Sequence, residues 1–424
     1  MSDTEKAYLI LADGTVFEGK AMGARGQTIG ETVFTTGMTG YIETLTDPSY
    51  FGQIVTQTFP LIGNYGVINE DFESRKSYVK GYVVREICDK PSNFRCQGDL
   101  DSFLKEQNIV GICGIDTRKL TKKLREAGVM NGMILSGVES PEETVMPTEE
   151  TVMPNLIRHL TEIRAYKITN AVKSVQQRET SVSGDFKGRS PLGEGAGGNG
   201  EAIAAEGETS PNKVSSSDSR LSVCLFDFGA KANIQRELEK RGCKVTVLPF
   251  DTKAEDVIAL APDGIMLSNG PGDPAENVGV IVEIRKLCEW NKEIVGSSPT
   301  MTGKAIPIFG ICLGHQMLAL ARGAKTSKLK YGHRGGNHPV KDLETDRVYI
   351  SSQNHGYAVE NDSLPTYARL RFVNSNDGTC EGIEYTDIPA FSVQFHPEAC
   401  GGPHDTNYLF DLFFEMMENK NATK

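Results

Sequence analysis

The second half of the chain alternates short apolar runs with amphipathic stretches. Residues 222–228, 244–248 and 264–268 have the length and composition of buried strands. Stretches with helical spacing of apolar residues follow them, at 234–241, 256–260 and 278–290. Apolar strands that alternate with helices predict a parallel sheet covered on both faces, the doubly wound α/β arrangement. Because ligands of such sheets bind at the carboxyl ends of the strands, we expect the active site of this half there.

The first half predicts shorter strands and more turns. Two apolar segments, 8–12 and 15–17, flank an Asp-Gly turn and predict a hairpin. Further strands are expected at 32–36, 53–60 and 81–85, and helices at 101–106 and 117–125, the latter capped by Asp116 or Thr117. Residues 37–50 are rich in Gly, Thr, Asp and Pro and predict a loop. Together these segments predict a mixed α/β domain.

Three segments interrupt this pattern. Residues 142–154 repeat one short unit, Glu-Glu-Thr-Val-Met-Pro, and residues 295–303 form a small Gly/Ser/Thr-rich insertion. Residues 179–219 are dominated by Gly, Ser, Glu, Ala and Pro, so we expect a flexible linker or disordered insertion that is dispensable for stability and activity. The predicted organisation is a domain at 1–155, a connector at 156–220 and a second domain at 221–420.

Composition narrows the class of protein. The length of 424 residues favours two or three domains, and the net charge of −11 argues against a nucleic-acid-binding surface. We find no apolar stretch near the roughly 20 residues that cross a bilayer and no signal peptide at the start, so no membrane contact is expected. The nine cysteines lack C-x-x-C spacing, which favours a reducing compartment, the cytoplasm, over disulfides or a zinc site.

The segment Gly310-Ile-Cys312-Leu-Gly314 lies between a predicted strand at 306–311 and helical spacing from His315 onward. The same order of strand, tight turn and helix presents the nucleophile of a G-x-S-x-G elbow. We expect the glycines to be required because a Cβ there would collide with the neighbouring strand and helix. The helix N-terminus would favour a thiolate on Cys312. Taken alone, the motif suits a buried structural cysteine equally well.

Two other predicted strand ends could complete a site. Ser268-Asn-Gly-Pro-Gly-Asp-Pro274 is a tight turn that could offer backbone N–H groups to an anion, although alone it is most simply a turn. His396 and Glu398 lie two positions apart, and such positions point the same way in an extended chain. Glu398 could then orient the imidazole that takes the proton of Cys312, although the pair alone would also suit a surface strand end.

These motifs resemble a known family. Gly310 to Gln316 with His396-Pro-Glu398 resembles the class I, or triad, glutamine amidotransferase signature. Other segments resemble the small, glutamine-hydrolysing subunits of carbamoyl-phosphate synthetases, namely 40–50, 62–66 and 114–118 in the first half and 268–274 and 352–358 in the second. The resemblance spans the chain except for 142–154, 179–219 and 295–303.

The resemblance implies a mechanism. Cys312 would attack the side-chain amide of glutamine to form a γ-glutamyl thioester, His396 would accept and return the proton, and Glu398 would fix His396. Backbone N–H groups near Gly270 and Leu313 would form the oxyanion hole. The implied contacts to the glutamine α-amino and carboxylate groups are Ser49, Gly272, Gln316, Asn354, Gly356 and Tyr357. We expect His315, His333 and His355 to be structural or at the surface.

The resemblance also implies a partner. Ammonia would pass through a tunnel to a separate large subunit, forming a heterodimer that makes carbamoyl phosphate from bicarbonate and ATP (EC 6.3.5.5). The chain contains no G-x-x-x-x-G-K-[ST] motif, so ATP and Mg²⁺ are assigned to the large subunit, and no cofactor or metal is expected here. Whether the product feeds pyrimidine or arginine synthesis is left open. An amidotransferase for another acceptor would lack the first-half motifs, and an inactive binding subunit would have lost the nucleophile.

Overall fold

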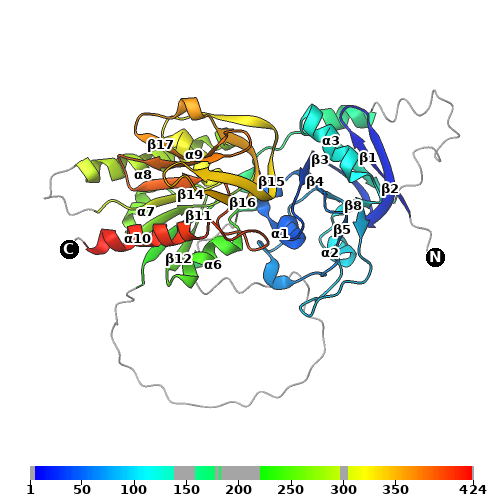
Figure 1. Cartoon of the computed structure of the whole chain (residues 1–424), viewed down its shortest axis with the longest axis horizontal. Helices are drawn as coiled ribbons and strands as arrows, with labels where there is room; N and C mark the ends of the chain where they lie inside the picture. Colours follow the sequence, from blue (N-terminus) through cyan, green and yellow to red (C-terminus); the bar gives the residue numbers. More distant parts are fainter. Residues whose placement is uncertain (1–4, 138–157, 177–180, 183–219, 297–303, 423–424) are drawn as a thin grey trace, which may run out of the picture.

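The computed structural model describes residues 5–137, 158–176, 181–182, 220–296 and 304–422, which form two lobes side by side (Figure 1). The first lobe is drawn in blue and cyan, and the second runs from green to red. Strands β15 and β16 and helix α1 lie where the two lobes meet. The repeat at 142–154 and most of the segments 179–219 and 295–303 lie outside the described residues.

The first lobe is built on a closed barrel with the strand order β1-β2-β8-β6-β4-β3-β9. Its strands are β1 (Lys6–Leu11), β2 (Val16–Gly23), β3 (Gly26–Thr35), β4 (Gln53–Gln57), β6 (Gly81–Val83), β8 (Val110–Cys113) and β9 (Met130–Ser136). The short strands β5 (Leu61–Ile62) and β7 (Glu86–Ile87) pair separately. The predicted hairpin is confirmed, since β1 pairs with β2 and Gly14 adopts the positive φ of 88° that its turn requires.

Helices α2 (Leu100–Glu106) and α3 (Thr117–Ala127) also follow the sequence prediction. The cap of α3 is Asp116, whose carboxylate accepts the Lys119 N–H at 2.9 Å. Side chains from all seven barrel strands contribute to one core cluster, in which Leu9, Ile54 and Ile134 are fully buried. The barrel is therefore closed around a packed apolar interior.

The prediction of a loop at 37–50 is wrong. This segment contains helix α1 (Tyr41–Thr46) and the 3-10 turn η1 (Pro48–Tyr50). Tyr41, Ile42 and Leu45 are buried, so tertiary packing overrides a composition that is typical of loops. The chain leaves the helix at Asp47, whose side chain caps η1. This turn carries Asp47 and Ser49 to the second lobe.

The second lobe holds a ten-stranded sheet with the order β10-β12-β11-β13-β14-β19-β18-β17-β15-β16. Its strands are β10 (Ser181–Val182), β11 (Ser222–Asp227), β12 (Lys244–Pro249), β13 (Gly264–Leu267), β14 (Ile308–Ile311), β15 (Thr326–Asp342), β16 (Val348–Val359), β17 (Ala368–Asn374), β18 (Cys380–Tyr385) and β19 (Ala390–Val393). Strands β12, β11, β13, β14 and β19 are parallel, as predicted. Strands β18, β17, β15 and β16 continue the sheet in antiparallel fashion, so the sheet is mixed and only its centre is parallel.

Helices cover both faces of this sheet, as the doubly wound prediction requires. They are α6 (Ala232–Lys240), α7 (Ala254–Ala259), α8 (Val278–Gly296), α9 (Leu313–Ala321) and α10 (Tyr408–Ala422). One core cluster packs α8 and α9 against the strands, and a second packs α6 and α10 against them. None of the helices in the described ranges is long and apolar enough to cross a membrane.

All nine cysteines are free thiols, as the prediction that the chain has no disulfide framework requires.

The prediction of a linker at 179–219 is wrong for Ser181–Val182, because these residues form β10 and pair with Val247 and Thr246 of β12. Backbone pairing at a sheet edge needs no apolar side chains, so composition could not reveal it.

The glycines around Cys312 permit a close strand–helix approach. Strand β14 ends at Ile311, Cys312 has the strained φ of 52° and ψ of −102°, and α9 begins at Leu313. A Cβ on Gly314 would lie 2.2 Å from the Leu267 carbonyl oxygen, and one on Gly310 would lie 3.0 Å from the Gly314 carbonyl carbon. The expectation that side chains would collide at these two glycines is confirmed.

We predict that Gly314→Ala destabilises the fold by about 1–3 kcal/mol or more, because the Leu267 backbone cannot move away as a side chain could. Thermal unfolding followed by circular dichroism would show a lower midpoint. Gly279→Ala in α8 is the matched control, since a Cβ there meets nothing within 4 Å, and its midpoint should stay or rise slightly. Equal midpoints for the two variants would contradict the role assigned to Gly314.

Candidate active site

Three neighbouring strand ends bring the predicted residues together. Strands β13, β14 and β19 are parallel neighbours, and the segments after them carry Gly270, Cys312 and His396. The Cys312 N–H donates to the Val393 carbonyl at 2.8 Å, which joins the elbow to the end of β19. The carboxyl edge of the parallel strands therefore holds all three segments that the sequence singled out.

His396 and Glu398 form a buried pair. His396 Nδ1 lies 2.7 Å from Glu398 Oε1, and both side chains are fully buried. The pairing is as predicted, but the reason given for it is wrong. Strand β19 ends at Val393, and the two residues lie in the turn around Pro397 rather than along an extended chain.

The charges of this pair stabilise one another. Burial and the nearby Lys231 oppose the imidazolium, but Glu398 and Cys312 outweigh them and raise the pKa of His396 to about 9. Burial also opposes ionisation of Glu398, yet His396 and Lys231 lower its pKa to about 2. A carboxylate that holds an imidazole in this way makes it a stronger acceptor for a thiol proton.

Cys312 is nearly buried and lies at the wall of a cavity. Its thiol donates to the Asn354 carbonyl oxygen at 3.7 Å and also interacts with His396, whose Nε2 has no other partner among the described residues. The backbone N–H groups of Gly270 and Leu313 also donate to no group in the described ranges. The arrangement thus offers a nucleophile, an imidazole nitrogen able to accept its proton, and two N–H donors for a developing oxyanion.

The cavity has a volume of about 410 Å³. Cys312 lines it together with seven of the eight residues that the resemblance assigned to glutamine or the oxyanion hole. These seven are Ser49, Gly270, Gly272, Gln316, Asn354, Gly356 and Tyr357. Leu313 is buried outside the lining, where only its backbone could take part.

Sequence reasoning missed Lys231 and Asp47. Lys231 Nζ lies 3.3 Å from Glu398 Oε1 and 3.7 Å from Asp47 Oδ2, and the lysine is 7% exposed. Burial disfavours its charge, but Asp47, Glu398 and Glu73 outweigh burial and raise the Lys231 pKa. A signal was present, because Lys231 follows the apolar strand β11 at the same carboxyl edge as Cys312. Asp47 could not be found, because it belongs to the other lobe.

The first lobe also reaches the site through Ser49. Its hydroxyl accepts a hydrogen bond from Asn269 Nδ2 at 2.9 Å, and its backbone N–H donates to Asp47 Oδ1 at 2.9 Å. The other carboxylate oxygen of Asp47 accepts from Asn354 Nδ2 at 2.9 Å. Asp47 therefore connects the loop that carries Ser49 to the strand that carries Asn354.

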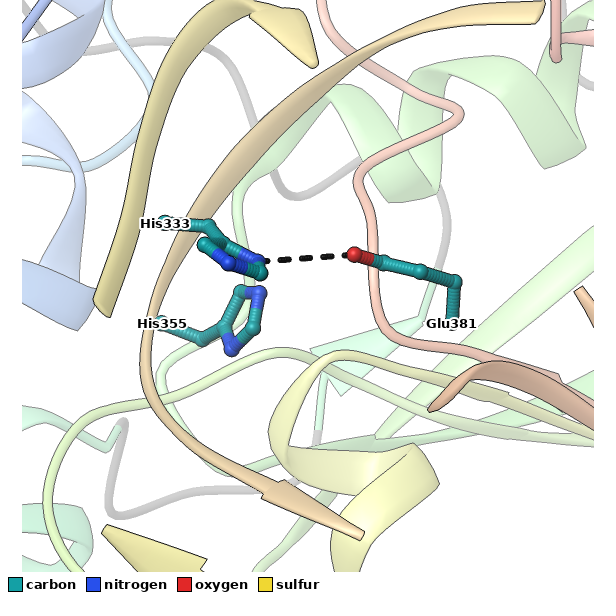
Figure 2. A group of neighbouring side chains, drawn as sticks. All are labelled: His333, His355 and Glu381. Atoms are coloured by element: carbon teal, nitrogen blue, oxygen red, sulfur yellow. Dashed lines mark ion pairs between the residues drawn. The ribbon is translucent and has the colours of Figure 1, made fainter. Parts of the chain in front are cut away.

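A second buried cluster consists of His333, His355 and Glu381 (Figure 2). Their potential metal-ligand atoms lie within 4.8 Å of one another, the only such group in the described part of the chain. Each ring nitrogen already has a protein partner: His333 contacts Asp377 at 2.8 Å and Glu381 at 3.5 Å. His355 contacts the Tyr357 carbonyl and Gln353 Oε1, each at 2.7 Å. Hydrogen bonding within the protein accounts for this cluster.

His315 is also buried and contacts Ser392 Oγ at 2.8 Å. Burial lowers the pKa of His315 to about 3, so the ring is neutral. The sequence left a structural or a surface position open for His315, His333 and His355. The burial of all three excludes the surface position.

Comparison with known proteins gives matches in both lobes. Residues 9–134 match the family described as carbamoyl-phosphate synthase small chain, CPSase domain, and residues 224–416 match glutamine amidotransferase class-I. The chain is 47% identical over 416 residues to the carbamoyl phosphate synthase small chain of Listeria monocytogenes serotype 4b, covering 98% of each chain. It is 46% identical to that of Fusobacterium nucleatum, covering 97% of this chain and 98% of the other.

A solved structure of a glutamine amidotransferase from Thermotoga maritima is similar over 48% of this chain and 86% of its own. The two share 19% identity, with a TM-score of 0.33.

We predict that Glu398→Gln slows alkylation of Cys312 by iodoacetamide at neutral pH. The neutral amide cannot stabilise the imidazolium, so the pKa of His396 falls and proton transfer from the thiol becomes less favourable. The rate can be measured by mass spectrometry of the Cys312 peptide. Alkylation of the partly exposed Cys88 of the first lobe in the same sample is the internal control and should not change. An unchanged Cys312 rate would show that Glu398 does not act through His396.

Proposed function

The chain belongs to the carbamoyl-phosphate synthase small-chain family, and from this premise we propose that Cys312, His396 and Glu398 hydrolyse glutamine through a covalent thioester. The chain is the glutamine-hydrolysing subunit of carbamoyl-phosphate synthase (EC 6.3.5.5), a ligase with a class I glutamine amidotransferase domain. The observation that supports the proposed triad is the strained elbow at Cys312, which borders the cavity beside the buried His396–Glu398 pair.

In the proposed reaction, Cys312 Sγ attacks the side-chain amide carbon of glutamine while His396 Nε2 takes the thiol proton. The N–H groups of Gly270 and Leu313 stabilise the oxyanion of the tetrahedral intermediate. The C–N bond then breaks, His396 returns its proton to the leaving nitrogen, and ammonia departs. Water, deprotonated by His396, attacks the thioester, which releases glutamate and restores the thiol.

The cavity suits a small polar substrate. Its volume of about 410 Å³ is within the ordinary range of small-molecule sites. Gln316 is held in place because its Nε2 donates to the Tyr357 carbonyl at 2.7 Å and to Gln394 Oε1 at 2.9 Å. Since Ser49 comes from the first lobe, the proposed glutamine site is complete only when both lobes are in contact. A tyrosine at 357 is compatible with a glutamine contact made by the main chain of this residue.

The proposed partner is the large subunit, which would bind ATP and Mg²⁺ and receive the ammonia. A second cavity of about 510 Å³ shares Asn354 with the first. Asp47, Lys231 and Ala399 line it, next to the triad. We assign this cavity to the path by which ammonia leaves Cys312. The nine free thiols support a reducing compartment, for which we propose the cytoplasm.

We expect an electrophilic glutamine analogue such as 6-diazo-5-oxo-L-norleucine to form one adduct, on Cys312, that competing glutamine suppresses. Mass spectrometry of the labelled chain, with and without the large subunit, would locate the adduct. The partly exposed Cys88 of the first lobe is the thiol control, because any labelling there should be insensitive to glutamine. Cys312→Ala should lose glutaminase activity by several orders of magnitude yet still support synthesis from added ammonia. Labelling of Cys312 that glutamine does not suppress would refute the assignment.

Channelling predicts that nitrogen from glutamine does not mix with ammonia in solution. The complex with the large subunit would be given glutamine labelled with ¹⁵N in its side-chain amide, in an excess of unlabelled ammonium at a pH where little free ammonia is present. We expect carbamoyl phosphate to keep most of the label. Label diluted to the isotopic composition of the solvent would contradict an enclosed path and would leave the triad chemistry unaffected.

A further inference from the structure

Arg334 is a buried arginine in the middle of β15. Its backbone pairs with Asn354 of β16, and the residue is 4% exposed. The guanidinium donates one hydrogen bond, from Nη1 to the Tyr331 carbonyl at 2.7 Å. Its Nε is buried and has no hydrogen-bond partner among the described residues. Within the same ranges no carboxylate lies within 4.0 Å of this guanidinium, so the charge has no ion pair.

The guanidinium borders the cavity that holds Cys312. Arg334 lines this cavity together with Asn354, Gly356 and Gln316. A Cβ on Gly356 would meet a single atom within 4 Å, which is Arg334 Nη2 at 3.4 Å. The space in front of Gly356 is therefore open except for one guanidinium nitrogen. Glu31 and Cys312, which line the same cavity, are near enough for their charges to act on Arg334, although neither forms an ion pair with it.

Arg334 differs from the two other cations on this cavity, because Lys167 is exposed and Lys328 is paired. Lys328 Nζ lies 2.5 Å from Glu31 Oε1, so these two charges neutralise one another at the junction of the lobes. A buried cation without an ion pair is costly, so a bound anion at this place would stabilise Arg334. The α-carboxylate is the one negatively charged group of glutamine. The planar carboxylate fits the fork of N–H donors on a guanidinium.

We propose that Arg334 binds the α-carboxylate of glutamine. This inference rests on the proposed function, because it assumes that glutamine occupies the cavity. It adds a side-chain charge to a subsite that the sequence assigned to neutral groups. Arg334 would place the amino-acid end of the substrate beside Gly356, which leaves the side-chain amide to extend to Cys312.

The test compares glutamine with its α-amide, L-glutaminamide, in which a neutral carboxamide replaces the carboxylate. Binding is measured by calorimetry on the Cys312→Ala chain in complex with the large subunit, so that neither ligand is consumed. With Arg334 present, glutamine should bind about 10- to 100-fold more tightly than the α-amide. In the additional variant Arg334→Gln this preference should fall to within about threefold.

Arg334→Lys should recover part of the preference, because lysine keeps the charge but loses the planar fork. Arg369→Gln is the matched control. Arg369 is exposed, lies on β17 of the same sheet and pairs with Glu384 at 2.6 Å, so this variant should keep the full preference. Circular dichroism of each variant would verify its fold.

Three results would overturn the inference: equal binding of the two ligands when Arg334 is present, a preference that survives Arg334→Gln, or an equal loss of both ligands in that variant. The last result would mean that Arg334 only supports the β15–β16 hairpin. Failure of the proposed function has a different signature. Glutamine hydrolysis and Cys312 labelling would then be absent in the unmodified chain, whereas the binding comparison does not depend on the thiol.

Discussion

The arrangement of the site depends on a set of buried charges at the contact between the two lobes. Lys231 lies between Glu398 of the triad and Asp47 of the first lobe, and all three are almost fully buried. Buried charges are stable only when they are paired, and separating the lobes would leave Lys231 without Asp47, while Glu398 would keep His396 and Lys231. Lys231 is therefore the group that links Glu398 of the triad to the packing of the lobes.

A second constraint acts at the nucleophile. The positive φ of Cys312 is unfavourable for a residue with a side chain, and it persists because the surrounding contacts fix it. The Cys312 N–H is bonded to β19, and the Gly314 N–H is bonded to the Ser268 carbonyl at 3.0 Å. Glycines at 310 and 314 allow these contacts to form. The strained turn thus presents the thiol to the cavity, and the hydrogen bonds to the sheet stabilise this conformation.

The two lobes contribute different parts of one chemical site. The second lobe supplies the nucleophile, the imidazole and the backbone donors, and the first lobe supplies Ser49 and Asp47. Asp47 contacts the side chain of Asn354, and the carbonyl oxygen of Asn354 accepts a hydrogen bond from the Cys312 thiol. A shift of the first lobe would move these contacts directly. A partner that binds across both lobes could therefore alter the reactivity of Cys312 by shifting the contact between Asp47 and Asn354.

The sequence by itself determined the elements whose signal is local. The alternation of apolar strands and helices predicted the parallel centre of the sheet, and Gly310-Ile-Cys312-Leu-Gly314 predicted the elbow, because steric exclusion at glycine acts over a few residues. Helix α1 was missed because its stability comes from burial against distant residues, and β10 because its pairing is made by backbone alone. The tertiary structure decided which charges meet. Asp47 and Arg334 look like surface residues in sequence, since nothing local records that folding removes them from water. Lys231 follows a strand end, but its pairing with Asp47 depends on the contact between the lobes, and Arg334 is left facing the cavity.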